Sequence, residues 1–155
     1  MKPELIYWDS CTFLGWLQEE ADKVDLCRGT LERAQGGEVG IITSALTITE
    51  VLWTKGGPKL TQDKADTLRR FFRHSYIRVH NVTRQIAEGA QDVVWNHNIK
   101  PKDAIHVATA IGLGIPVLET FDGPLLGHSG MVGSPPLLIR KPIPAKQPGL
   151  FDGKP

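Results

Sequence analysis

Short apolar runs alternate with longer amphipathic segments along most of the chain. Leu5-Ile6-Tyr7-Trp8 is rich in strand-forming residues, and Asp9-Ser10 behind it can cap a helix from about Cys11 to Leu17. The same alternation continues to about residue 140. It predicts strands at residues 5–8, 39–42, 76–80, 116–119 and 137–139, and helices at 11–17, 24–34, 44–54, 61–72, 83–97 and from about 103 to 112 or 114.

Strands that alternate with helices indicate an α/β domain with a mainly parallel sheet covered on both faces. Such sheets place their ligand sites where the carboxyl ends of the strands run into helices. Asp9 directly follows the first strand, Glu50 lies about two turns into the helix after the second, and Asp122 lies just beyond residues 116–119. We expect these three acids at one edge, whereas the place of Asp103 depends on the topology.

Length and composition fit one ordinary globular domain. The chain has 155 residues, 41% of them hydrophobic and 23% charged, and no apolar run approaches the roughly 18 residues of a membrane-spanning helix. We therefore expect a cytoplasmic protein without a membrane contact. The two cysteines lack zinc-site spacing, which favours reduced thiols. Residues 1–142 are predicted to form the domain and the Pro-, Gly- and Lys-rich residues 143–155 a flexible tail.

The predicted tail contains one short motif. Gln147, Leu150 and Phe151 stand in a segment that is similar to the peptides that bind bacterial sliding clamps. For a segment of this composition, an unstructured tail without a partner is the default interpretation.

Positive charge is concentrated in one stretch although the net charge is only +1. Between Lys55 and His80 there are seven Lys and Arg residues against two acids. This stretch is either a solvated helix face or a contact for a phosphate backbone. The candidates for the second role are Arg69, Arg70 and Arg73.

The acids have structural explanations when each is taken alone. Asp9 and Asp103 could be helix caps, Glu50 a surface residue, and Asp122 part of an Asp-Gly turn. However, Asp9 and Glu50 adjoin apolar sequence that should be packed, where gathered carboxylates would repel one another. A bound Mg²⁺ or Mn²⁺ would resolve the repulsion, because these hard cations prefer oxygen ligands. A carboxylate and metal site suits phosphodiester hydrolysis by a metal-activated water.

Four segments of the chain resemble the signature segments of PIN-domain nucleases. They are "LIYWDSCTFL", "ITSALTITEVL", "KPKDAIHVATA" and "VLETFD", and the similarity spans about Leu5 to Pro142. The resemblance implies a three-layer α/β/α fold with a central, mainly parallel sheet, and Mg²⁺- or Mn²⁺-dependent endoribonuclease activity. It also implies RNA as the substrate and, since many small bacterial members are toxins of toxin-antitoxin pairs and commonly dimeric, a cognate antitoxin and a homodimer.

The resemblance also assigns roles to individual residues. Ser10 and Thr120 match positions where a hydroxyl supports the site, and His106, three residues after Asp103 on the same helical face, is interpreted as a packed structural histidine in preference to a phosphate contact. The implied metal-binding and catalytic residues are Asp9, Glu50, Asp103 and Asp122.

Two other classes of function compete with this interpretation. A catalytically silent PIN-like module could bind RNA or a protein, although retention of all four acids argues against it. An aspartyl-phosphate mechanism could use Asp9 as nucleophile, but the second acid that haloacid-dehalogenase-like phosphatases usually carry two residues later is Cys11 here. Cleavage of DNA stays open as well, because attack by a metal-bound water does not need the 2′-hydroxyl.

Overall fold

A five-stranded parallel sheet forms the centre of the protein, in a computed structural model that describes residues 2–53 and 56–145. The strands are β1 (Glu4–Trp8), β2 (Val39–Ser44), β3 (Ile77–His80), β4 (Val117–Glu119) and β5 (Leu138–Arg140). Their order across the sheet is β3-β2-β1-β4-β5, and every neighbouring pair is parallel. The prediction of a parallel sheet is therefore confirmed.

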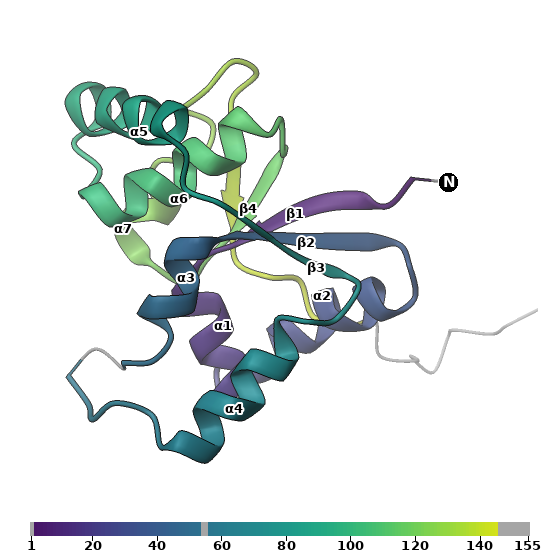
Figure 1. Cartoon of the computed structure of the whole chain (residues 1–155). Helices are drawn as coiled ribbons and strands as arrows, with labels where there is room; N and C mark the ends of the chain where they lie inside the picture. The colour runs from purple at the N-terminus through teal and green to yellow at the C-terminus, as the bar shows by residue number, and fades with distance from the viewer. Residues whose placement is uncertain (1, 54–55, 146–155) are drawn as a thin grey trace, which may run out of the picture.

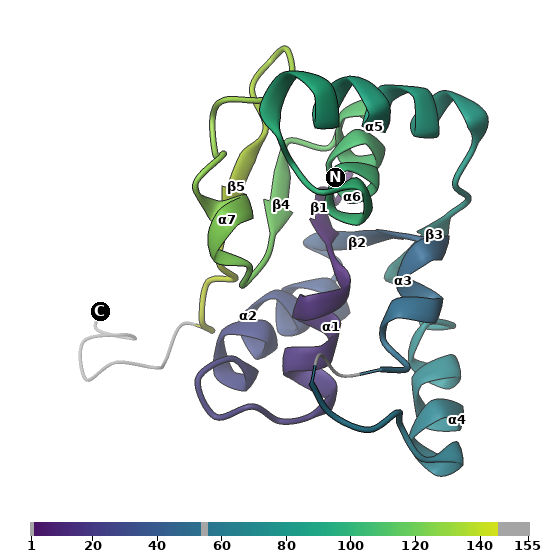
Figure 2. The same ribbon diagram turned by 90° about the vertical axis from the view of Figure 1, so that its left-hand side faces the viewer.

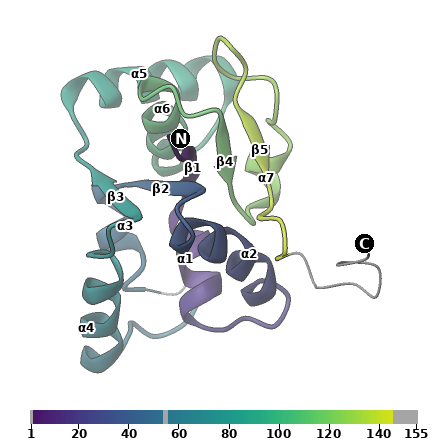
Figure 3. The same ribbon diagram turned by 90° about the vertical axis from the view of Figure 1, so that its right-hand side faces the viewer.

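Helices cover both faces of this sheet, as the three-layer prediction required. They are α1 (Ser10–Leu17), α2 (Val24–Gln35), α3 (Ala45–Glu50), α4 (Gln62–Phe71), α5 (Arg84–His97), α6 (Pro101–Gly112) and α7 (Gly123–Leu126). Figure 1 shows α5 and α6 on one side of the sheet and α1, α2 and α4 on the other. Figures 2 and 3 show α7 beside β4 and β5.

Two hydrophobic cores arise because neighbouring residues of a strand point to opposite faces. Tyr7 and Ile42 belong to the core under α5 and α6. Ile6, Trp8 and Ile41 belong to the core on the other face. The β1 side chains from Ile6 to Trp8 are fully buried, so the first strand contributes to both cores at the centre of the sheet.

Side-chain caps begin most of the helices where the sequence predicted them to begin. Ser44 accepts a hydrogen bond from the backbone N–H of Leu46 at the start of α3. At the starts of α4 and α5, the side chains of Thr61 and Thr83 each accept a hydrogen bond from the backbone N–H three residues later. These short polar side chains satisfy backbone donors that have no partner inside the helix.

The structure corrects three expectations about helices. The helix predicted to reach about residue 54 ends at Glu50, because the chain turns back so that Trp53 forms an antiparallel bridge with Lys59. The α6 helix begins at Pro101, where a proline fits the first turn. In place of a simple Asp-Gly turn after Asp122, the chain forms the short helix α7.

The chain passes over α2 after its last strand. A Cβ atom at Gly29 would lie 2.1 Å from the carbonyl oxygen of Ile143, so only a glycine permits this close approach. Residues 146–155, including the sliding-clamp candidates Gln147, Leu150 and Phe151, lie outside the described residues, and the domain boundary after Pro142 stays a prediction. Among the described helices, none combines the length and apolarity needed to cross a membrane.

Candidate metal and active site

The four candidate acids lie at the carboxyl edge of the sheet or on the helices that adjoin it. Asp9 directly follows β1 and caps α1, and Asp122 follows β4 and caps α7. Glu50 is the last residue of α3, and Asp103 lies in the first turn of α6. The alternative of a helix cap therefore holds for Asp9, but not for Asp103, because Lys100 occupies the N-cap position of α6. Asp122, for which the alternative was an Asp-Gly turn, also caps a helix.

Asp9 is buried, and several donors fix its carboxylate. Its Oδ1 accepts hydrogen bonds from the backbone N–H of Thr12 at 3.1 Å and the hydroxyl of Thr12 at 2.9 Å. Its Oδ2 accepts one from the Thr120 hydroxyl at 2.5 Å. The side chain is 3% exposed, so these bonds compensate for the loss of water around the charge.

Asp103 lies within electrostatic reach of the other three acids. Burial is the largest cause that raises the pKa of Asp103 to about 6, and the charges of Asp122, Asp9 and Glu50 raise it further. His106 acts in the opposite direction. A carboxyl group whose pKa is raised by burial and by neighbouring acids is typical of functional sites. The α6 helix, whose position the sequence left open, thus brings Asp103 to the other acids.

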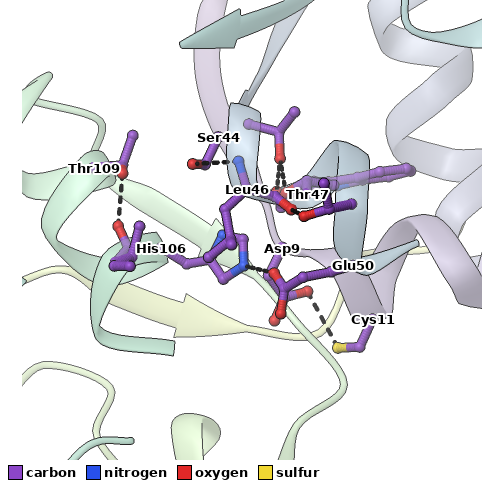
Figure 4. A network of polar contacts seen from close by, with 12 residues as sticks. Asp9, Cys11, Ser44, Leu46, Thr47, Glu50, His106 and Thr109 are labelled. Carbon is purple, nitrogen blue, oxygen red and sulfur yellow. Dashed lines mark hydrogen bonds and ion pairs between the residues drawn. The ribbon is translucent and has the colours of Figure 1, made fainter. Parts of the chain in front are cut away.

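Glu50 is bound by a buried histidine from α6. Nε2 of His106 lies 2.7 Å from Oε1 of Glu50, and Nδ1 lies 2.6 Å from the hydroxyl of Tyr7. Figure 4 shows His106 reaching across to Glu50. The sequence correctly placed His106 on the same helical face as Asp103, but it did not anticipate that His106 would contact another of the candidate acids.

The hydroxyl and thiol groups around Asp9 differ in part from those that the sequence suggested. Thr120 contacts Asp9 as expected, whereas no hydrogen bond joins Ser10 to a candidate acid in residues 2–53 and 56–145; Thr12 supplies the second hydroxyl. Cys11, which the spacing alone did not connect with the site, donates to Oδ1 of Asp9 at 3.1 Å. Burial, followed by the charge of Asp9, raises the pKa of Cys11, so the thiol stays protonated.

A further carboxylate, Glu119, was missed by the sequence analysis and belongs to a separate network. It is fully buried on β4, where it accepts hydrogen bonds from Nε1 of Trp8 at 2.8 Å and the hydroxyl of Thr30 at 2.6 Å. Arg140 approaches its other oxygen at 3.4 Å. Glu119 thus links β4 to β1, β5 and α2, and its satisfied bonds indicate a structural role.

The three candidate arginines of the basic stretch differ in what surrounds their side chains. Arg69, Arg70 and Arg73 are all exposed. Arg69 lines an open hollow of about 550 Å³ between the end of α3 and α4, together with Leu52 and Lys59. Arg70 instead donates to the hydroxyl of Thr67 on its own helix. Of the three arginines, only Arg69 thus lines a depression that begins beside the end of α3.

The donor set of the site fits a hard divalent cation. Its four carboxylates supply only oxygen ligands, which suits Mg²⁺ or Mn²⁺ better than zinc. Within the described part of the chain, no Lys or Arg forms an ion pair with any of the four, and no three His, Cys, Asp or Glu side chains are grouped closely enough to hold one ion as they stand.

The fold and the site together define a parallel α/β/α domain with a carboxylate cluster at the carboxyl edge of its sheet. The PIN domain family model matches residues 6–125. The chain therefore belongs to the PIN domain family. None of the curated protein sequences compared with it matches.

Solved structures share this fold at low sequence identity. Mycobacterium tuberculosis VapC20, described as a Sarcin-Ricin loop cleaving toxin, superposes with a TM-score of 0.60 and 21% identity over 76% of this chain and 90% of that chain. A toxin-antitoxin complex from Klebsiella pneumoniae gives 0.63 and 19% over 90% and 98%. VapBC2 from Rickettsia felis, bound to a DNA fragment from its promoter, gives 0.62 and 14% over 88% and 97%.

Proposed function

We propose that the protein is a metal-dependent endoribonuclease that uses Asp9, Glu50, Asp103 and Asp122 to bind Mg²⁺ or Mn²⁺. The observation that carries the proposal is the convergence of three acids on Asp103, which raises the pKa of its carboxyl group. A fold that needed these residues only as caps or surface charges would gain nothing from placing them within range of one another, since the repulsion costs stability.

The residues would divide the work as follows. Asp9, held by Thr12 and Thr120, would provide a rigid carboxylate at the end of β1. Glu50 and Asp122 are partly exposed and would turn toward the same cation. When bound, the cation would lower the pKa of a coordinated water and offset charge on the phosphate. No nucleophilic side chain is then needed, and attack by water predicts products with 5′-phosphate and 3′-hydroxyl ends.

RNA is the substrate that we propose, with part of the basic stretch as its contact surface. Arg69 is the best placed of the three candidate arginines, because it and Lys59 line the hollow that begins beside the end of α3. Arg70 and Arg73 are retained as weaker candidates on the same exposed helix end. Positive side chains here would offset phosphate charge along the strand.

The structural relatives support a role as the toxin of a toxin-antitoxin pair. One is described as a toxin that cleaves the Sarcin-Ricin loop, and two are toxin-antitoxin assemblies. We accordingly propose an antitoxin as protein partner, a homodimer as the assembled form and the cytoplasm as the location. Expression of the chain alone should arrest growth, and an Asp103→Asn variant should not. Equal growth arrest by both would separate toxicity from this site.

A chelation experiment tests the catalytic proposal directly. Cleavage of a structured RNA should stop in excess chelator and return with Mg²⁺ or Mn²⁺, because the carboxylates act through the ion. Undiminished cleavage in the chelator would contradict the metal mechanism, and a 2′,3′-cyclic phosphate product would indicate attack by the neighbouring hydroxyl instead. RNA binding without cleavage under any metal condition would favour the alternative function, a catalytically silent PIN-like module that binds RNA or protein.

A further inference from the structure

A buried histidine connects one of the proposed metal ligands to the first strand. His106 lies on α6 one turn after Asp103, and only 1% of it is exposed. Its two ring nitrogens bond different elements, Nε2 to Glu50 at the end of α3 and Nδ1 to Tyr7 in β1. The Tyr7 and His106 rings also contact edge to face, with their centroids 5.7 Å apart. Both nitrogens of the imidazole are thus engaged.

The chemistry of the partners fixes the direction of the bond to Glu50. An ionised carboxylate has no proton to donate, so Nε2 must carry the proton and donate it to Oε1. This holds for the neutral ring and for the charged one, because either form can have a proton on Nε2. The Tyr7 hydroxyl, as donor or as acceptor, then determines the orientation of the ring.

Glu50 needs such support more than Asp9 does. Asp9 sits at the end of a central strand and accepts bonds from two hydroxyls and a backbone amide. Glu50 ends a helix of only six residues, and its longer side chain is 17% exposed. Within residues 2–53 and 56–145, His106 is the one hydrogen-bond partner of its carboxylate. A free glutamate at this place would lose more rotational freedom on binding a ligand.

We infer that His106 is a positioning residue that holds the Glu50 carboxylate toward Asp9 and Asp103, and that Tyr7 fixes the imidazole in the orientation that this requires. The inference rests on the proposed metal site and goes beyond it, because it assigns His106 a purpose other than packing or phosphate binding. Partners in this outer position commonly change metal affinity by about 10- to 100-fold.

Two polar substitutions of His106 separate positioning from packing. His106→Gln places an amide N–H where Nε2 stood and keeps the bond to Glu50. His106→Asn places its amide near the position of Nδ1 and cannot reach Glu50. Titration calorimetry with Mn²⁺ alone, on the purified full chain, measures affinity without RNA and without turnover. We expect His106→Asn to weaken Mn²⁺ binding by about 10- to 100-fold, and His106→Gln to stay within about threefold of wild type.

A double substitution shows whether His106 acts through Glu50. In a Glu50→Gln background, His106→Asn should change Mn²⁺ affinity no further, since the carboxylate that it positions is gone. An equal loss in both backgrounds, or equal affinities of the Asn and Gln variants, would overturn the inference and leave the metal site standing. A wild-type protein that binds no Mn²⁺ would overturn the proposed function and this inference with it. Metal-free melting curves of each variant verify that the compared proteins are folded.

Discussion

Replacing Asp103 with asparagine should stabilise the metal-free protein near neutral pH, although it removes a proposed ligand. The pKa of Asp103 is raised to about 6 from 3.8, mainly by burial and then by Asp122, Asp9 and Glu50. An acid whose pKa is raised on folding adds stability only while it is protonated. That contribution is complete below about pH 4 and is lost as the pH rises through 6.

The size of the effect follows from the same shift. About two pKa units correspond to at most roughly 3 kcal/mol. Because the Asp103 side chain is only partly buried, solvent screening reduces this to on the order of 1 kcal/mol. The first turn of α6 favours a negative charge by about 0.3–1 kcal/mol, which lowers the gain further. In a domain of this size, each kcal/mol of added stability raises the melting temperature by about 2–4 °C. We therefore expect Asp103→Asn to raise the metal-free melting temperature at pH 7.5 by up to about 2–4 °C.

Melting curves in chelator at several pH values measure the prediction. The gain of Asp103→Asn should shrink as the pH falls through 6 and vanish only below the unfolded-state pKa of 3.8, where the acid is neutral in both states. Asp92→Asn is the matched control, because Asp92 is an exposed acid on α5, and it should change stability by less than about 0.5 kcal/mol. A variant that is less stable than wild type at pH 7.5, or a gain independent of pH, would refute the electrostatic reasoning.

With Mg²⁺ present, wild type should be more stable and more active than Asp103→Asn, which is the reverse of their metal-free order of stability. Mg²⁺ at about ten times its dissociation constant should stabilise wild type by roughly 1.4 kcal/mol and Asp103→Asn by much less. Cleavage by the variant should fall at least about a hundredfold, a loss of about 2.7 kcal/mol in transition-state stabilisation. Asp9→Ala provides a contrast, since Asp9 caps α1 and its removal should destabilise even the metal-free protein by about 0.5–2 kcal/mol.

Two further predictions concern packing and RNA contact. Gly29→Ala should destabilise the protein by about 1–3 kcal/mol, since its Cβ would meet the backbone of Ile143 at 2.1 Å. The control Gly89→Ala, whose Cβ would lie 3.7 Å from a neighbour, should stabilise α5 by up to about 1 kcal/mol. Urea unfolding measures both changes in the free energy of unfolding, and equal effects would contradict the close approach at Gly29. Arg69→Ala should lower the salt dependence of RNA binding by about 0.7 in slope, and Arg73→Ala by less; an unchanged slope for Arg69→Ala would return this stretch to a solvated helix face.

The local sequence was enough to predict the five strands and every helix except the short α7, and where most of these elements begin. Continuous apolar runs such as residues 5–8 predict a strand because both sides of a central strand are buried. Thr61 and Thr83 predict helix starts because their side chains cap backbone N–H groups only a few residues further along the chain. The end of α3 at Glu50 was different. It depends on the bridge between Trp53 and Lys59, a contact that helical periodicity does not encode.

The candidate site needed the tertiary structure to become more than a set of acids. Asp9 could be placed at the sheet edge because it directly follows a strand, and Asp122 because it lies just beyond another. Asp103 could not, because it precedes its strand and reaches the other acids only through the packing of α6. The bond between Glu50 and His106 joins residues 56 positions apart in the sequence. Such pairings follow from the strand order and the helix packing, which bring distant segments together irrespective of the local patterns that define each one.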